Sequence, residues 1–296
     1  MRWHFICSAQ TYFHEIQMTH ALTLCSPDQD KSCFACCPPI RPALYEHIQY
    51  QKEMGRFLRE NRESYNPLSK EIKPITGFSC WALGFVDDEC KRVGCLLHPV
   101  QNGGIDLRYR IDYGDKCRRE TCEEEKVFAS LEMDERRFWL HLADGLNSFT
   151  YSSRAVNPLF KMIQWGKYLL QRIAAEEAGK MFTWDAFLQA YPFFSIECKP
   201  KGNAYLVNEL VRKNRLHILK TDSFCSEFET ISSRISQQIQ DQMNVHTSGP
   251  FTHQLNLDTY YLDFLRLSGK ILKMNLDTAV HLKKIVDHEL EQIEYA

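Results

Sequence analysis

Cysteine is the residue type in this sequence with the greatest potential for chemistry. The chain of 296 residues contains 12 cysteines. A Cys-x2-Cys spacing lets the chain turn back so that both sulfurs reach one metal, as in zinc and iron–sulfur sites. The sequence therefore predicts a metal site built from four groups of side chains: Cys33, Cys36 and Cys37; Cys80; Cys90, Cys95 and His98; and Cys117 and Cys122.

The spacing within these groups predicts loops around the ligands. Residues five positions apart on a helix point about 140° apart. The four-residue gaps before Cys95 and Cys122 can therefore serve a shared metal only outside a helix. Five glycines between residues 78 and 122 favour such loops.

The adjacent pair Cys36 and Cys37 carries a separate expectation. In an extended chain, neighbouring side chains point to opposite faces. One of the two is expected to bind the principal metal, while the other packs away or serves a second centre. On this basis, substitution of one abolishes metal retention and substitution of the other has little effect.

The donor set favours an iron–sulfur cluster over zinc as the cofactor. Thiolate-rich sites select either, but eight cysteines from Cys33 to Cys122, plus His98, exceed the ligands of one zinc ion. Two zinc sites, one cluster with spare cysteines, or two centres all remain open. The segment Cys90-x4-Cys95-x2-His98 has the spacing of a plant-type [2Fe–2S] loop with His in place of a Cys, and a second Cys-x2-Cys pair, as in zinc ribbons, is absent.

The predicted function is accordingly that of an iron–sulfur protein with a redox, sensing or cluster-dependent enzymatic role. Two alternatives are a non-catalytic interaction protein with structural Zn²⁺ sites and a thiol-redox protein. Basic residues within the cysteine region are expected to screen a thiolate-rich cluster or to bind an acidic ligand. They are Arg108, Arg110, Lys116, Arg118 and Arg119.

The cellular compartment that the sequence predicts favours metal binding over disulfide formation by the cysteines. The first 17 residues lack an uninterrupted apolar run, and no stretch approaches the roughly 20 apolar residues of a membrane span. A reducing cytoplasmic location is predicted, where spaced cysteines more often bind metal than form disulfides. Met18 is an alternative start, in which case Cys7 and the rest of 1–17 form an uncertain extension.

Residues 32–122 resemble the family of zinc- or iron-chelating cysteine-cluster proteins. The resemblance rests on Cys33-Phe34-Ala35-Cys36-Cys37, Cys80-Trp81-Ala82-Leu83, Asp87-Asp88, Cys90, Cys95, His98-Pro99 and Cys117-Arg118. One Cys-x2 step before the doublet is missing, and His98 stands where the family has Arg. The resemblance implies a metal centre and no particular reaction.

The fold expected is mainly α. Residues 18–125 form a loop-rich, cysteine-dense metal-binding module, apart from a helix over 43–65, and residues 126–296 form a helical domain. Apolar periodicity predicts helices over 158–178, 184–190 with Thr183 as N-cap, 205–219, 224–245, 258–268 and 277–293, and the acidic run from Glu123 begins another.

Charge and motifs exclude several classes of function. The formal charge of −2 argues against bulk binding of polyanions. A basic strip over 199–220 is more typical of a solvated helix face, so nucleic acid binding is disfavoured, while a protein partner remains open. The phosphate-binding glycine motifs, the Gly-x-Ser-x-Gly elbow and the helical His-Glu-x2-His motif are absent from the sequence.

Overall fold

The computed structural model describes residues 22–37, 51–76, 80–112, 117, 121–243 and 249–293. Helix accounts for 56% of the structure and strand for 4%, so the expected mainly α class is confirmed. The prolines at 38, 39 and 42, the first residues of the helix expected over 43–65, and the extension over 1–17 lie outside the described residues.

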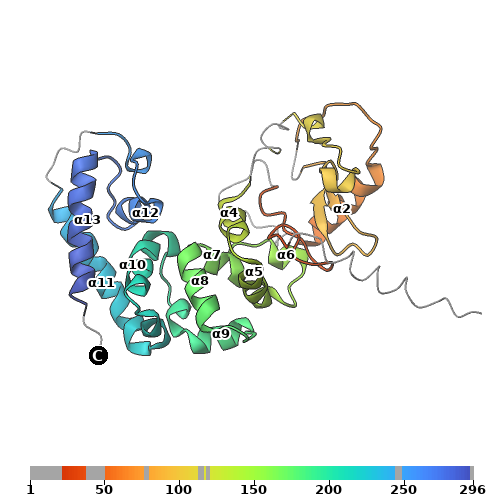
Figure 1. The fold of residues 1–296 in the computed structure, drawn as a ribbon. Helices are drawn as coiled ribbons and strands as arrows, with labels where there is room; N and C mark the ends of the chain where they lie inside the picture. The colour runs from red at the N-terminus through yellow and green to blue at the C-terminus, as the bar shows by residue number, and fades with distance from the viewer. Residues whose placement is uncertain are drawn as a thin grey trace, which may run out of the picture.

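The back part of the chain is a series of packed helices (Figure 1). They are α4 (Glu123–Ala129), α5 (Met133–Leu140), α6 (Ser148–Tyr151), α7 (Pro158–Ile163), α8 (Lys167–Glu176), α9 (Trp184–Ala190), α10 (Pro200–Arg212), α11 (Asp222–Asp241), α12 (Thr259–Leu267) and α13 (Leu276–Glu291). Short 3₁₀ turns lie at Pro99–Gln101, Arg108–Arg110, His141–Ala143, Pro192–Ser195, Leu216–Lys220 and Thr252–Gln254.

Local chemistry explains where these helices begin and end. The Thr183 hydroxyl accepts a hydrogen bond from Ala186 N at 3.3 Å, which confirms it as the N-cap of α9. The single helix expected over 158–178 is wrong, because the chain breaks into α7 and α8 at Gly166. Gly166 has φ +95°, and a Cβ there would collide with the Tyr260 ring.

In the described residues of the front part, one helix and one hairpin make up most of the regular structure. These are α2 (Gln51–Ser64) and an antiparallel hairpin of β1 (Leu83–Phe85) and β2 (Val93–Cys95), in which Gly84 pairs with Gly94. Figure 1 shows α2 and α13 at opposite ends of the molecule. A Cβ on Gly84 would lie 2.9 Å from a methyl carbon of Leu96 and 3.3 Å from the Leu58 carbonyl, so the glycine lets α2 approach the hairpin.

The front and back parts of the chain each have a hydrophobic core, and each core includes a residue from the other part. The larger one unites the back helices around Trp139, Phe187 and Phe193. The smaller one gathers Met54 and Leu58 of α2 with the hairpin. Leu24 belongs to the larger core and Phe149 of α6 to the smaller, so the division at residue 125 stays a prediction. Within the described ranges, none of the helices combines the length and apolar character that a membrane crossing needs.

A buried carboxylate joins the end of α8 to two neighbouring turns. Glu177 accepts hydrogen bonds from Lys180 Nζ at 2.6 Å, Lys220 Nζ at 2.7 Å and the Tyr191 hydroxyl at 2.8 Å. Burial favours the neutral acid, yet these donors outweigh it and lower the pKa of Glu177 to about 2. Lys220, a member of the basic strip over 199–220, is therefore neutralised within the fold.

Replacement of this carboxylate should weaken the fold in a pH-dependent way. We expect Glu177→Gln to lower the free energy of unfolding at pH 7 by roughly 1–3 kcal/mol, because the lysines lose a buried partner. The depressed pKa means that the ionised carboxylate stabilises the fold fully above its ordinary pKa of 4.5 and less as pH falls towards 2. The variant should therefore lose less stability than wild type between pH 5 and pH 3. Urea unfolding at several pH values measures both effects.

Glu176→Gln is the matched control. Its carboxylate is half-exposed and lies 3.4 Å from Lys220 Nζ. We expect a change of no more than about 0.5 kcal/mol there. Equal losses in the two variants would contradict a special role for Glu177.

Candidate functional site

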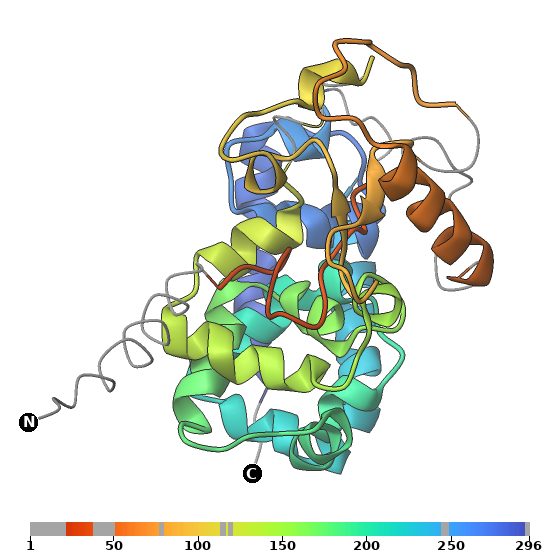
Figure 2. The same cartoon turned by 90° about the vertical axis from the view of Figure 1, so that its right-hand side faces the viewer.

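A loop over residues 22–37 is fastened between the hairpin and the back helices. The Ser32 hydroxyl donates to the Val93 carbonyl and accepts from Val93 N, both at 2.7 Å. Ser32 N donates to the Ser148 hydroxyl at 3.1 Å, and Phe34 N donates to the Ser152 hydroxyl at 2.9 Å. Figure 2 shows this loop, in red, running across the helices drawn in green. These hydrogen bonds hold the loop backbone to the hairpin on one side and to the back helices on the other.

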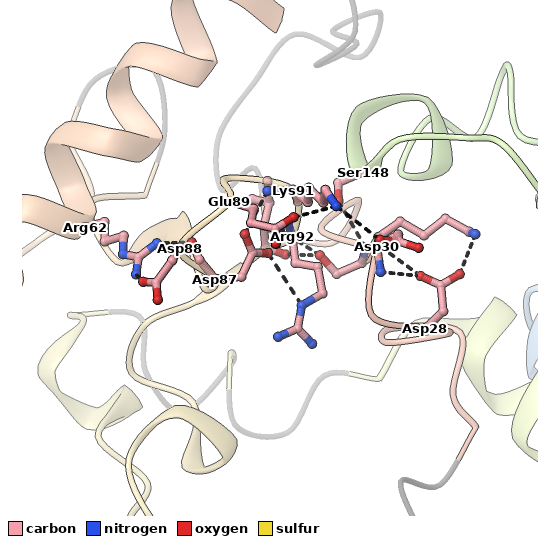
Figure 3. Close-up of polar contacts among 12 residues, drawn as sticks. Asp28, Asp30, Arg62, Asp87, Asp88, Glu89, Lys91, Arg92 and Ser148 are labelled. Atoms are coloured by element: carbon pink, nitrogen blue, oxygen red, sulfur yellow. Dashed lines mark hydrogen bonds and ion pairs between the residues drawn. The ribbon is translucent and has the colours of Figure 1, made fainter. Parts of the chain in front are cut away.

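Charged side chains reinforce the same junction at the surface (Figure 3). Lys91 Nζ lies 3.5 Å from Asp30 and 2.5 Å from Glu89, and the Lys91 carbonyl accepts from the Ser148 hydroxyl at 2.6 Å. Arg62 of α2 contacts the Asp87 carbonyl and the Asp88 carboxylate. The loop, the turn of the hairpin, α2 and α6 are thereby tied together.

Four cysteines, which we name the first set, lie on the back-helix side of this loop: Cys25, Cys33, Cys36 and Cys122. Cys33 N donates to the Cys25 carbonyl at 2.9 Å, which brings those two residues together. Burial, together with the nearby Glu125, Cys36 and Cys122, raises the pKa of the Cys25 thiol to about 12. Burial also raises the pKa of Cys33, with added contributions from the other three cysteines of the set. All four sulfurs therefore lie within electrostatic reach of one another.

The second set comprises Cys37, Cys80, Cys95 and Cys117. A hydrogen bond with the Cys36 thiol and burial raise the pKa of Cys37, and Cys95 and Cys80 add to that increase. Burial raises the pKa of Cys80 to about 11 and that of Cys95 to about 12, and Cys117 acts on both. These four residues pack against the smaller core, whereas Cys33 packs against the larger one.

Backbone N–H groups donate to several of these sulfurs from two or three residues further along the chain. Hydrogen bonding from the backbone at Ala35 lowers the pKa of Cys33, that from Ala82 and Leu83 lowers the pKa of Cys80, and that from Leu97 lowers the pKa of Cys95, each against the larger effect of burial. Cys122 is the N-cap of α4, where its Sγ accepts from Glu125 N at 3.3 Å. Such bonds favour the thiolate over the thiol, and hydrogen bonds to sulfur tune thiolate-bound clusters.

The geometry does not itself form a metal site. In the described part of the chain, no three side chains of His, Cys, Asp or Glu are arranged to hold a metal ion. The predicted metal-binding character of the module is therefore not confirmed. The raised pKa values fit thiols that keep their protons, and metal binding would have to remove those protons.

The relation between Cys36 and Cys37 differs from the expectation. A hydrogen bond with the Cys36 thiol raises the pKa of Cys37, so the two side chains approach each other, while the expected unequal effect of their substitution on metal retention stays a prediction. The cause of the approach is the turn at residues 35 and 36, where Cys37 N donates to the Phe34 carbonyl at 3.0 Å. The pair nevertheless divides between the sets, because Cys36 acts on Cys25 and Cys33 while Cys95 and Cys80 act on Cys37.

Three residues depart from the grouping that sequence spacing suggests. Cys25 joins the first set, although it has no close neighbour in the sequence. Cys90 stands at the turn before β2 with φ +55° and packs against the smaller core, outside both sets. His98 caps a 3₁₀ turn, since its Nδ1 accepts from Val100 N at 3.2 Å, and burial lowers its pKa. Four of the grouped cysteines share hydrogen bonding from a backbone group two or three residues further along the chain: Cys33, Cys80, Cys95 and Cys122. This shared local feature, and not the spacing between cysteines, is what sets them apart in the sequence.

The two sets differ in their charged neighbours. Glu125 is buried beside the first set, where its carboxylate accepts from Leu24 N at 2.8 Å. Glu124 raises the pKa of Cys122, and Arg154, which lies 3.1 Å from Glu124, lowers it. Beside the second set, Arg108 lowers the pKa of Cys95 and donates to the Cys117 carbonyl at 3.1 Å.

Comparison of the chain with models of protein families, with curated proteins and with solved structures finds no match. The resemblance of residues 32–122 to cysteine-cluster proteins, like the assignment of Cys33, Cys36, Cys37, Cys80, Cys90, Cys95, His98, Cys117 and Cys122 as metal ligands, stays a prediction.

Proposed function

We propose that the cysteine-rich part of this protein binds two iron–sulfur clusters, one on each set of four cysteines, and acts in electron transfer or redox sensing. The observation that supports the proposal is the mutual electrostatic influence of the cysteines within each set around one fastened loop, with the two sets in contact through Cys36 and Cys37. Four thiolates are the full ligand set of a [2Fe–2S] or [4Fe–4S] cluster and of a structural zinc site.

Several features of the sets suit thiolate-bound metal. The backbone N–H groups aimed at Cys33, Cys80, Cys95 and Cys122 would stabilise negative charge on sulfur. None of the eleven cysteines in the described ranges forms a disulfide. The clusters would supply one-electron chemistry when bound, and the protein would hold them, orient them and limit their contact with water.

The adjacency of Cys36 and Cys37 favours the redox role. Consecutive α-carbons are about 3.8 Å apart, so ligands of the two centres would be covalent neighbours. Two clusters so placed could exchange electrons directly. A cluster with four cysteine ligands has no open position for substrate, which favours electron transfer or sensing over direct catalysis.

Structural zinc is the second candidate, because the front part is poor in buried apolar side chains. Among the described residues, its core consists of 11 buried residues, one of them Phe149 from α6. Its only described sheet has two strands of three residues each. Small folds of this kind are often held together by metal.

Thiol-redox chemistry is less well supported. Reactive cysteines need a lowered pKa, usually from neighbouring cations or a helix N-terminus. Here the pKa values of Cys25, Cys33, Cys37, Cys80, Cys95 and Cys122 are all raised, with burial or the contact between the Cys36 and Cys37 thiols as the largest cause. In the metal-free state these side chains would be poor nucleophiles at neutral pH.

Metal analysis of the full-length protein, purified without oxygen, tests the proposal. We expect about four to eight iron atoms per chain with matching acid-labile sulfide, and a broad absorption near ~400 nm. A colourless protein with about two zinc atoms would replace the redox role by the structural one. A folded protein with neither metal would contradict both.

Substitution of the adjacent pair tests the division into two sets. We expect Cys36→Ser and Cys37→Ser each to remove about half of the bound metal, because each would deprive one centre of a ligand. Equal partial losses would differ from the expectation from sequence, in which one substitution abolishes metal retention and the other has little effect. Cys90→Ser and Cys225→Ser are the controls and should retain full metal content.

The two losses should also be additive, so that the double variant retains almost no metal. Complete loss from either single variant would indicate one shared centre. Unchanged metal content in both would contradict the assignment. Circular dichroism of the helical part distinguishes loss of metal from loss of fold.

A further inference from the structure

The loop between α12 and α13 is paired with the turn that precedes α12. Phe251 and Lys273 form an antiparallel bridge. Beside it, Thr252 N donates to the Leu272 carbonyl at 2.9 Å, and the buried Thr252 hydroxyl donates to the Ile271 carbonyl at 2.8 Å. The pairing holds the loop at the N-terminal end of α13, at the end of the molecule away from α2 (Figure 1).

Large apolar side chains are exposed around this paired loop. Leu272 is 62% exposed. Leu276 and Val280 are one turn apart on α13 and share its exposed face. Single exposed apolar side chains are ordinary, whereas a gathering of them marks a contact surface. Five of the thirteen exposed large apolar side chains in the described residues lie in this short stretch: Phe251, Leu267, Leu272, Leu276 and Val280.

Exposed lysines alternate with these apolar side chains. Lys273 Nζ lies 4.7 Å from the centroid of the Phe251 ring. Lys270 is exposed on the same loop, and Lys284 is exposed on α13 one turn beyond Val280. The ion pairs of the described residues include none of these three lysines, so their charge is available to a partner.

The other charges of this region leave a positive excess. Residues 249–284 contain five basic and three acidic side chains, although the whole chain carries a formal charge of −2. Two of the basic side chains are paired within their helices, Arg266 with Asp263 at 2.7 Å and Lys283 with Asp287 at 2.6 Å. The other charged side chains are the three lysines and the aspartates near the first residues of α12 and α13, which are Asp258 and Asp277.

From this arrangement we propose that the protein docks onto an anionic lipid bilayer through a surface that we name the basic apolar surface. Its apolar side chains enter the boundary between headgroups and acyl chains, and its lysines contact the lipid phosphates. Docking of this kind needs no spanning helix. The surface is made of Phe251, Leu272, Leu276 and Val280 with Lys270, Lys273 and Lys284.

The position of Lys270 allows the charge to be removed without a change of fold. Its φ is +55°, a conformation that glycine adopts with less strain than lysine. The fold alone would favour glycine at this position. The cytoplasmic location predicted from sequence would also place the surface beside the membrane leaflet that carries anionic lipids.

Co-sedimentation of the full-length protein with lipid vesicles tests the proposal. We expect binding to phosphatidylcholine vesicles that contain roughly a third phosphatidylserine, and little binding to phosphatidylcholine alone, because the lysines need anionic headgroups. Added salt should weaken the binding through screening.

Two substitutions separate the contributions of charge and apolar contact. Lys270→Gly and Leu272→Gln should each weaken binding to the anionic vesicles by about fivefold or more. Circular dichroism and the urea midpoint should stay at wild-type values, because both side chains are exposed. Lys161→Gln on α7 and Met181→Gln, which is 76% exposed after α8, are the matched controls and should bind as wild type.

The outcomes separate a lipid surface from other partners. Failure to bind the anionic vesicles, or weakening by only one of the two substitutions, would overturn the proposal. Binding of polyglutamate in place of vesicles would identify an acidic protein as the partner and would overturn it as well. Metal content does not enter these measurements, so the inference stands or falls separately from the proposed function.

Discussion

The arrangement of the cysteines depends on the hydrogen bonds that hold residues 22–37 between the hairpin and the helices. The Ser32 hydroxyl bonds to both backbone groups of Val93, and the hydroxyls of Ser148 and Ser152 bond to the loop from the other side. These hydroxyls are buried, so each bond that is lost would leave a polar group without water. The loop has no regular secondary structure of its own and takes its shape from these partners.

This constraint explains how one short segment contributes cysteines to both sets. Phe34 is fully buried and meets Phe149 edge to face, with ring centroids 5.4 Å apart. Its position fixes the turn that follows, and the turn puts Cys36 and Cys37 in contact. From that point Cys36 acts on Cys25, Cys33 and Cys122, the last at the start of α4, while Cys95 at the end of β2 and Cys80 act on Cys37. A shift of the turn would disturb both sets together.

The sequence predicts those features of the fold that depend on residues close together in the chain, such as the first residues of helices. The cap at Thr183 and the start of α4 at Glu123 follow from side chains within a few residues. The break at Gly166 was missed because its cause, Tyr260, is remote in the chain. The same limit applies to the cysteines. Cys117 and Cys122 are close in sequence but belong to different sets, and Cys25 meets Cys122 only because Leu24 bonds to Glu125.

The cysteines of the two sets are in surroundings that contain hydrogen-bond donors for a thiolate, although burial favours the protonated thiol. Burial holds their protons on, while backbone N–H groups at Cys33, Cys80, Cys95 and Cys122 already point at the sulfurs. These two effects oppose each other in the thiol form, but only the N–H groups remain favourable once a metal replaces the protons and supplies the positive charge that burial demands. Metal binding and ordering of the front part would then be one event. Such coupling would account for a segment whose described residues form so small a core and include so many cysteines.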